Sequence, residues 1–294
     1  MDTASTRDDH GAGEHETGNQ QDGRGWRVSR RTVLGAMSVA GAGMLGTPAW
    51  AEETRDAAAL PAEHLPSARE MDAQAMRSFS RIRGVEVYYG TQTSPLRTWS
   101  CTSGFYGRLG DWMDTLSAWS GQAGHGPVKS IGSAGFYVNK AGQHGAGTAM
   151  DLSIVRWSGG RNSNMFNGDH ASGNRTRRRR YFAVEATLRR HFRYCLDGNY
   201  NAAHANHFHV DVGGLPNRRL LHGSRADTVF VQAVANNFLG AGIAVDGVWG
   251  SRTQQEVTKL KNRLDVSGDL QRNQAAVGKL LRGIAVHGFR DQAI

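Results

Sequence analysis

The chain has 294 residues, enough for one or two domains, and a formal net charge of +9. A basic balance favours an anionic partner, such as a bacterial cell wall or nucleic acid. After residue 51, no stretch is long and apolar enough to span a bilayer, which excludes an integral membrane protein for the mature form.

The N-terminal region has the features of an export signal. Residues 1–25 are polar and rich in Gly and Asp, so we expect disorder there. Arg30 and Arg31 precede a weakly apolar stretch, and an Ala-x-Ala pattern ends at Ala51. This resembles a twin-arginine signal cleaved after Ala51, because the apolar run is too short for a transmembrane anchor. We therefore expect a secreted or cell-wall protein. Its net charge rises to +10, since residues 1–51 carry five Arg and six Asp or Glu.

Hydrophobic periodicity predicts a first domain over residues 76–216, after a linker at 52–75 that is rich in Ala, Glu and Pro. The predicted strands lie at about 81–90, 128–137, 149–156 and 208–212, and the predicted helices at 109–119 and 181–192. We expect an α+β fold with a mainly antiparallel sheet and flanking helices.

A break at residues 213–216 precedes a region of different character. Residues 224–294 favour a small three-helix domain, with helices near 229–239, 253–264 and 275–281. Asp246 and Gly247 favour a turn between the first two helices, and Thr253 can cap the second.

An arginine run stands just before the second helix of the first domain. It has two interpretations, a solvated loop or a loop that contacts an anionic wall. No aromatic residues are interleaved with it, so we expect no nucleic-acid binding. The run consists of Arg175, Arg177, Arg178, Arg179 and Arg180.

Two cysteines, Cys101 and Cys195, are the only ones in the chain. In an exported protein such a pair fits one disulfide. Both thiols could equally be free, and the spacing alone does not decide between the two states.

Two histidine-rich segments point to a metal centre. In a strand, residues two apart share a face, so His207 and His209 point the same way, and Asp151 lies on the polar face of its own strand. Glycines at 145 and 147 permit a tight turn that returns His144 to Asp151. Nitrogen and carboxylate ligands without sulfur favour Zn²⁺, with Mn, Ni or Co as alternatives. Three ligands leave one position open for water, as in catalytic zinc sites.

These segments resemble known families. His144-x-x-Gly147-x-Ala149-x-Asp151, with the later His207-x-His209, is similar to the zinc D-Ala-D-Ala carboxypeptidases and endopeptidases of peptidase family M15. Those enzymes share their zinc site with the hedgehog signalling domain, so the resemblance implies a fold of that type. The segment from Cys195 to Asp211 resembles, more closely, the extensin-like C-terminal domain family.

The resemblance implies a role for each residue. His144, Asp151 and His209 would be the zinc ligands, and His207 a catalytic partner. Many relatives carry an acidic general base three residues before the last ligand, where this chain has Asn206. An amide cannot take up the proton, so His204 or His207 would substitute, or Asp211 would act from a distance.

A second departure concerns substrate binding. Relatives carry an upstream Arg that contacts the substrate, and here the nearest cation is Lys140. The lysine ammonium would offer a single point charge, whereas an arginine guanidinium can donate two parallel hydrogen bonds to a carboxylate.

The C-terminal region has a resemblance of its own. Its Asp246-Gly247-x-x-Gly250-x-x-Thr253 pattern is similar to the three-helix peptidoglycan-binding domain attached to many wall hydrolases. The Phe-Gln pair usual in the second helix is absent, and Trp249 is the residue expected to contact the wall.

Together these features predict an exported zinc metallopeptidase, a monomer, that hydrolyses peptide bonds in bacterial peptidoglycan as a D,D- or L,D-carboxypeptidase or endopeptidase. The main alternative is a non-catalytic, zinc-containing cell-wall-binding protein, which Asn206 keeps open. A third hypothesis, a nucleic-acid-binding secreted protein, rests on the arginine run alone.

Overall fold

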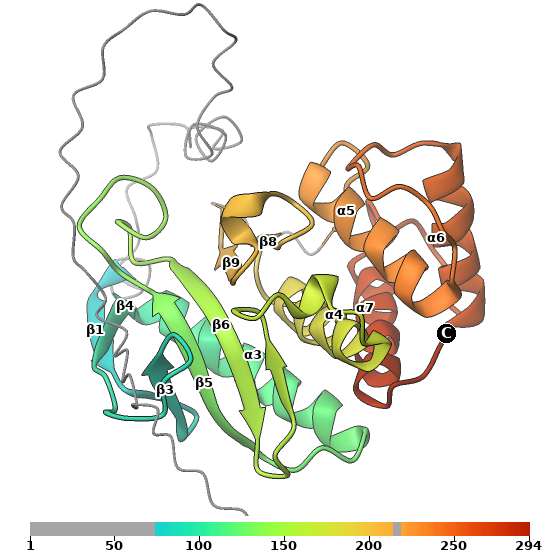
Figure 1. Cartoon of the computed structure of the whole chain (residues 1–294). Coiled ribbons are helices and arrows are strands. Elements are labelled where there is room, and N and C mark those ends of the chain that lie inside the picture. Colours follow the sequence, from blue (N-terminus) through green and yellow to red (C-terminus); the bar gives the residue numbers. More distant parts are fainter. Residues whose placement is uncertain (1–73, 214–218) are drawn as a thin grey trace, which may run out of the picture. The chain divides into compact units, whose positions relative to one another are not determined.

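The computed structural model describes residues 74–213 and 219–294 (Figure 1). The predicted export signal and nearly all of the predicted linker lie outside the described residues. Within the described ranges, no helix has both the length and the apolar character needed to cross a membrane.

A mixed sheet forms the centre of the described part. Its strands follow the order β2-β3-β5-β6-β9-β8, with β7 paired to β6, and β1 and β4 form a separate two-stranded sheet. Every pairing is antiparallel except that of β3 with β5. This confirms the predicted α+β class with a mainly antiparallel sheet. The strands are β1 (Met76–Phe79), β2 (Arg81–Ile82), β3 (Val85–Tyr89), β4 (Trp99–Thr102), β5 (Val128–Gly135), β6 (Ala149–Trp157), β7 (Asn162–Asn164), β8 (Tyr194–Leu196) and β9 (Phe208–Asp211).

Strand β6 positions the site because it pairs with β5, β7 and β9. Met150 and Leu152 are fully buried, as the predicted alternation requires, whereas Asp151 between them is partly exposed. Each long apolar side chain that is buried contributes about 1.5–3 kcal/mol. The antiparallel register with β9 then places Asp151 opposite His209.

Helices α3 (Ser103–Gln122) and α4 (Arg175–Arg189) contribute large apolar side chains to the core. Both begin earlier than the apolar periodicity predicts, because Thr102 and Asn174 cap them by accepting backbone hydrogen bonds. The two helices are joined where Nε1 of Trp112 donates to Oγ1 of Thr187, at 3.0 Å.

The arginine run is neither of the loops we considered; it forms the first turns of α4. Arg178 donates to the side chain of Asn237 at 2.6 Å, and Arg179 donates to the carbonyl of the same residue at 3.0 Å. Arg180 donates to the carbonyl of Asn162, at the start of β7, at 2.8 Å. Those three arginines therefore join parts of the fold, while Arg175 is exposed.

The C-terminal region contains the predicted helices. They are α5 (Arg225–Val234), which continues as the π-helical turn η3 (Ala235–Leu239), α6 (Ser251–Arg263) and α7 (Gln274–Phe289). Helix α7 packs along α4 within a shared hydrophobic core (Figure 1). The structure therefore marks no boundary between two separate bodies among the described residues.

The predicted cap of α6 was wrong. The N-cap residue is Gly250, whose position has no side-chain cap, and Thr253 lies inside the helix with its hydroxyl facing the carbonyl of Val248. The predicted turn before α6 is present, with a φ of 76° at Gly247. Gln232 holds it by accepting from the backbone of both Asp246 and Gly247.

Candidate metal centre

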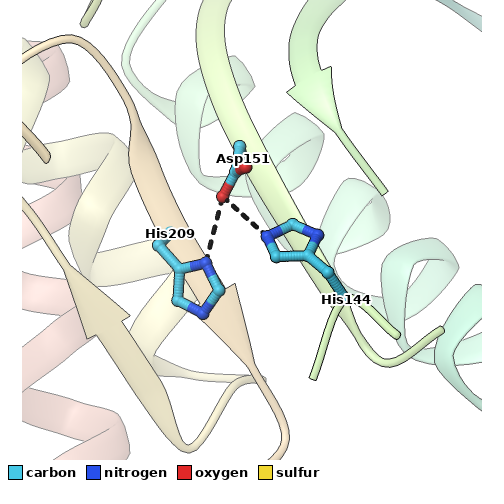
Figure 2. A group of neighbouring side chains, drawn as sticks. All are labelled: His144, Asp151 and His209. Carbon is cyan, nitrogen blue, oxygen red and sulfur yellow. Dashed lines mark hydrogen bonds and ion pairs between the residues drawn. The ribbon is translucent and has the colours of Figure 1, made fainter. Parts of the chain in front are cut away.

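Three side chains from separate segments meet beside strand β6: His144, Asp151 and His209 (Figure 2). Asp151 lies on β6 and His209 on β9, where the two residues are direct partners in the antiparallel register. Side chains at such positions lie about 5 Å apart, so strand pairing alone brings these two together. His144 reaches them from the loop between β5 and β6.

The glycines of that loop allow His144 to turn back, as the sequence predicts. Gly147 has a φ of 69°, in the left-handed region that favours glycine. A Cβ atom at Gly145 would lie 1.5 Å from the carbonyl oxygen of Lys140, so only glycine fits. The loop is closed where Val138 donates from its backbone to the carbonyl of His144 at 3.3 Å.

One oxygen stands at the centre of the cluster. Nε2 of His144 and Nδ1 of His209 lie 3.1 and 3.0 Å from Oδ1 of Asp151. One candidate ligand atom from each residue lies within 4.8 Å of the other two. The Asp151 side chain is 20% exposed, whereas the imidazoles are 8% and 4% exposed, so the cluster is enclosed yet reachable from solvent.

In each imidazole, the ring nitrogen that faces away from Asp151, the outer nitrogen, also has a hydrogen-bond partner. Nδ1 of His144 lies 2.5 Å from the carbonyl oxygen of Phe136, and Nε2 of His209 lies 3.1 Å from Oδ2 of Asp211. Metal-bound histidines in proteins almost always donate their second N–H to a carbonyl or carboxylate. In neutral rings with these protons placed outward, the inner nitrogens would direct their lone pairs toward the same point as Asp151. The donor set therefore fits a cation.

The electrostatics of the cluster agree with this fit. Burial raises the pKa of Asp151, but hydrogen bonds from His144 and His209 outweigh it and hold that pKa well below its usual range. Burial lowers the pKa of His209, yet its bonds to Asp151 and Asp211 raise it to about 10. Oδ1 of Asp211 is buried without a partner among the described residues. The site thus favours positive charge, whether from a proton or a metal ion.

Two further histidines lie beside the cluster, as the sequence predicts. Nε2 of His207 is 3.6 Å from Oδ1 of Asp151, and the ring of His204 is centred 5.2 Å from that of His207 and 5.9 Å from that of His209. Burial lowers the pKa of His207 and lowers that of His204 to about 4, with His207 and His209 adding to the effect. Both rings are therefore neutral at pH 7.

Gly135, which was not among the predicted site residues, pairs with Asp151 across strands β5 and β6. A Cβ atom at this position would lie 3.4 Å from Oδ2 of Asp151 and 3.8 Å from the ring of His144. Glycine thus leaves space beside the cluster on the β5 side. A glycine inside a strand signals such close approach, so this residue could have been singled out.

Two predicted substrate-binding residues do not contact the cluster. Lys140 is exposed on the loop that carries His144. Trp249 lies before α6, where its ring stacks on His222 at 3.8 Å and Nε1 donates to Gln254 at 3.0 Å. Roles for Lys140 and Trp249 in substrate binding stay predictions.

The cysteines are not paired. Cys101 and Cys195 are both buried free thiols, which corrects the expectation of a disulfide in favour of its alternative. They lie in strands of different sheets, β4 and β8, so no strand pairing brings them together. Burial raises the pKa of Cys101 to about 12 and that of Cys195 well above its usual value. Both thiols are therefore protonated at neutral pH.

Comparison with known proteins identifies one segment. Neither the curated proteins nor the solved structures yielded a match to the chain. The relation to zinc D-Ala-D-Ala carboxypeptidases, hedgehog-type folds and peptidoglycan-binding domains therefore stays a prediction. Residues 122–219 match the sequence model of a family described as "Extensin-like protein C-terminus". The matched segment contains His144, Asp151 and His209, so the candidate metal centre lies within the part of the chain that is similar to this family.

Proposed function

We propose that this protein is an exported zinc metallopeptidase that hydrolyses peptide bonds in bacterial peptidoglycan. One observation carries the proposal: Nε2 of His144, Oδ1 of Asp151 and Nδ1 of His209 converge on one point, with both outer nitrogens held. Two imidazoles and a carboxylate are a common ligand set for catalytic zinc, and they leave one position open. A zinc ion bound there would lower the pKa of a coordinated water to about 7 and polarise a scissile carbonyl.

The remaining residues of the cluster supply proton transfer and orientation. His207 is the candidate base, because its Nε2 atom already faces the carboxylate that would hold the metal. Asp211 holds the outer nitrogen of His209, and Phe136 holds that of His144 through its carbonyl. These contacts fix both rings before any substrate arrives, which reduces the reorganisation that the reaction requires.

The substrate class rests on charge and on location. The chain is basic, and its N-terminal sequence resembles an export signal, so it would meet an anionic wall outside the cell. Lys140, on the loop next to His144, offers an exposed cation to a substrate carboxylate. The proposal covers both carboxypeptidase and endopeptidase activity.

The test is release of new termini from purified peptidoglycan, measured with and without a chelator. We expect new amino and carboxyl groups in the presence of Zn²⁺, loss of release with the chelator, and recovery when Zn²⁺ is restored. A His207→Ala variant should bind zinc and release at least tenfold fewer termini, since general base catalysis contributes about 10²–10⁴-fold. No chelator-sensitive release from any wall type would disprove the peptidase.

A second candidate is a zinc-containing wall-binding protein without catalysis. It is favoured by Asn206, an amide at the position where the resembled peptidases carry an acid. In the described ranges, Asp151 and Asp211 are the acidic residues in contact with the cluster, and both are engaged by histidines. Zinc-dependent retention on peptidoglycan without release of termini would support this candidate over the first.

A further inference from the structure

A small pocket lies between helix α4 and the C-terminal helices, and its lining is strongly positive. The charged residues of the lining are Arg189, Arg193, Arg219 and Asp227. Three guanidiniums against one carboxylate give it a formal charge of +2. The rest of the lining is apolar and includes Phe192 and Leu281, so the charged groups stand beside a surface that does not hydrate them.

The carboxylate of this pocket is already engaged. Oδ1 of Asp227 accepts from Arg189 at 2.7 Å, and Oδ2 accepts from the backbone N–H of Leu221 at 2.9 Å. Arg189 is only 5% exposed and also donates to Glu185, at 2.8 Å. Because Asp227 is bonded to Arg189, it does not compensate the charges of Arg193 and Arg219.

Arg193 is half-buried, yet it forms no ion pair within residues 74–213 and 219–294. Its guanidinium carbon lies 4.6 Å from the centre of the Tyr194 ring, which is a cation–π contact. Gly213 packs against its stem, since a Cβ atom there would lie 2.9 Å from Cγ of Arg193. These contacts hold the side chain in place. Partial burial removes water from the guanidinium, and an anion can replace that lost hydration.

Arg219 lies at the rim of the pocket. Its side chain is exposed and has no acidic partner in the described part of the chain. The residues that follow it are anchored, because the backbone N–H of Leu220 donates to the carbonyl of Leu270 at 3.1 Å and that of Leu221 to Asp227. The backbone that carries Arg219 is therefore fixed beside the pocket, within reach of a ligand held by Arg193.

We propose that this pocket binds a small oxyanion, a phosphate or a carboxylate group, through Arg193 and Arg219. A guanidinium donates two parallel hydrogen bonds to either group, and such charge-assisted bonds are about twice as strong as neutral ones. The apolar walls strengthen them further, because the attraction between opposite charges grows as the surroundings become less polar. The pocket shares no residue with the candidate metal centre, so the proposal does not depend on the proposed function.

Calorimetric titration of the full chain with inorganic phosphate, and separately with acetate, tests the proposal. The protein is stripped of metal and dialysed free of chelator, and chloride keeps the ionic strength constant, so neither a bound metal nor general screening contributes. We expect one saturable site. Tighter binding of phosphate assigns the pocket to phosphate groups, and tighter binding of acetate assigns it to carboxylates. No saturable binding of either ion overturns the proposal.

Substitution of the two arginines assigns the binding to this pocket. Arg193→Gln and Arg219→Gln should each raise the Kd about tenfold or more, the usual effect of losing a hydrogen bond to a charged group. Arg193→Lys should give an intermediate Kd, since an ammonium keeps the charge but loses the paired bonds. Arg252→Gln, which removes an exposed charge from α6, is the control and should stay within twofold of the wild type. An equal loss in Arg252→Gln would show that the ion responds only to net charge.

Backbone amide NMR spectra of the wild-type chain locate the ion without any substitution. We expect phosphate or acetate to shift the signals of Arg193, Arg219 and Leu220 most. The histidine cluster is the competing cationic site, so the largest shifts at His144 and His209 would contradict the proposal. This measurement decides the question even where a variant at Arg193 fails to fold.

Discussion

Oδ2 of Asp211 lies 3.1 Å from Nε2 of His209, two residues earlier on the same strand. Residues two apart in a strand share a face, so β9 carries both the candidate ligand and the carboxylate that orients it. The bond leaves Nδ1 of His209 as the atom that faces Asp151. The strand therefore determines which nitrogen is offered to a metal ion.

Removal of this carboxylate should weaken metal binding without removing a ligand. We expect Asp211→Ala to raise the Kd for Zn²⁺ about 10–100-fold, the usual cost of losing a residue that orients a ligand. Asp211→Asn should lie between Asp211→Ala and the wild type, because its amide oxygen can still accept. Competition with a chromophoric chelator measures the Kd. Asp246→Asn, in the turn before α6, is the control, and a Kd for Asp211→Ala within twofold of the wild type would contradict the orienting role.

Loss of a candidate ligand should have a different signature from loss of a histidine that is proposed to act in catalysis. His209→Ala should lose stoichiometric zinc, whereas His204→Ala and His207→Ala should retain it. Free Zn²⁺ at 1,000 times its Kd stabilises a folded protein by about 4 kcal/mol. That corresponds to a rise in Tm on the order of 10 °C for a chain of this size. Chelation should therefore lower the Tm of the wild type but not that of His209→Ala. Unchanged zinc content in His209→Ala would remove it from the ligand set.

His125 should make stability sensitive to mild acid. Its Nε2 atom donates to the carbonyl of Phe289 at the end of α7, at 2.9 Å, while Nδ1 is buried without a partner among the described residues. Burial lowers the pKa of His125 to about 4. Because the unfolded ring titrates near 6.5, the unfolded state binds more protons between these values. The stabilisation that comes from this pKa difference is thus fully present above pH 6.5 and is lost as the pH falls toward 4. The loss in unfolding free energy is about 3 kcal/mol at most.

The measurement is urea unfolding across that pH window. The fall in unfolding free energy between pH 7 and pH 4.5 should be smaller in His125→Gln than in the wild type. His287→Gln, on the same helix as Phe289, provides the comparison, since other histidines also titrate in this range. Equal falls in His125→Gln and the wild type would show that His125 is protonated in the folded state.

Arg189 is the charged group whose removal should cost most stability. It donates to Glu185 at 2.8 Å and to Asp227 at 2.7 Å, and its side chain is only 5% exposed. Burial, with Asp197 adding to it, raises the pKa of Glu185 to about 8 despite this partner. Arg189→Met would leave the buried carboxylate of Asp227 and the buried carboxyl of Glu185 without their cation, which costs about 3–5 kcal/mol. Chemical unfolding measures the loss. The matched Arg272→Met breaks an exposed pair and should change little.

The sequence was sufficient to predict the residues of the cluster. Period-two alternation separates Asp151 and His209 from the apolar neighbours on their strands, and the pairing of β6 with β9 then places the two residues opposite each other. The same alternation brought His207 close to Asp151. Strands β1 and β4 were missed because each is short and lacks a run of alternating apolar residues.

What was not predicted depends on contacts between segments distant in sequence or on local dihedral angles. The hydrogen bond from His204 to Asn201 needs the 3-10 turn that brings the side chain of Asn201 back to the ring. The bonds of Arg178 and Arg179 to Asn237 need the packing of α4 against the C-terminal region. Side-chain composition indicates neither, since an arginine run that joins parts of a fold has the same sequence as one that faces solvent.

The segment that matches the extensin-like family does not include the whole hydrophobic core that supports it. It begins at the last residue of α3 and ends before α5, so it omits strand β3 and nearly all of α3 on one side and α7 on the other. A fragment of residues 122–219 would expose the buried faces of β5 and α4 to water. Fusion or domain-exchange experiments should therefore transfer at least residues 74–294, because the matched segment and the structure that supports it have different boundaries.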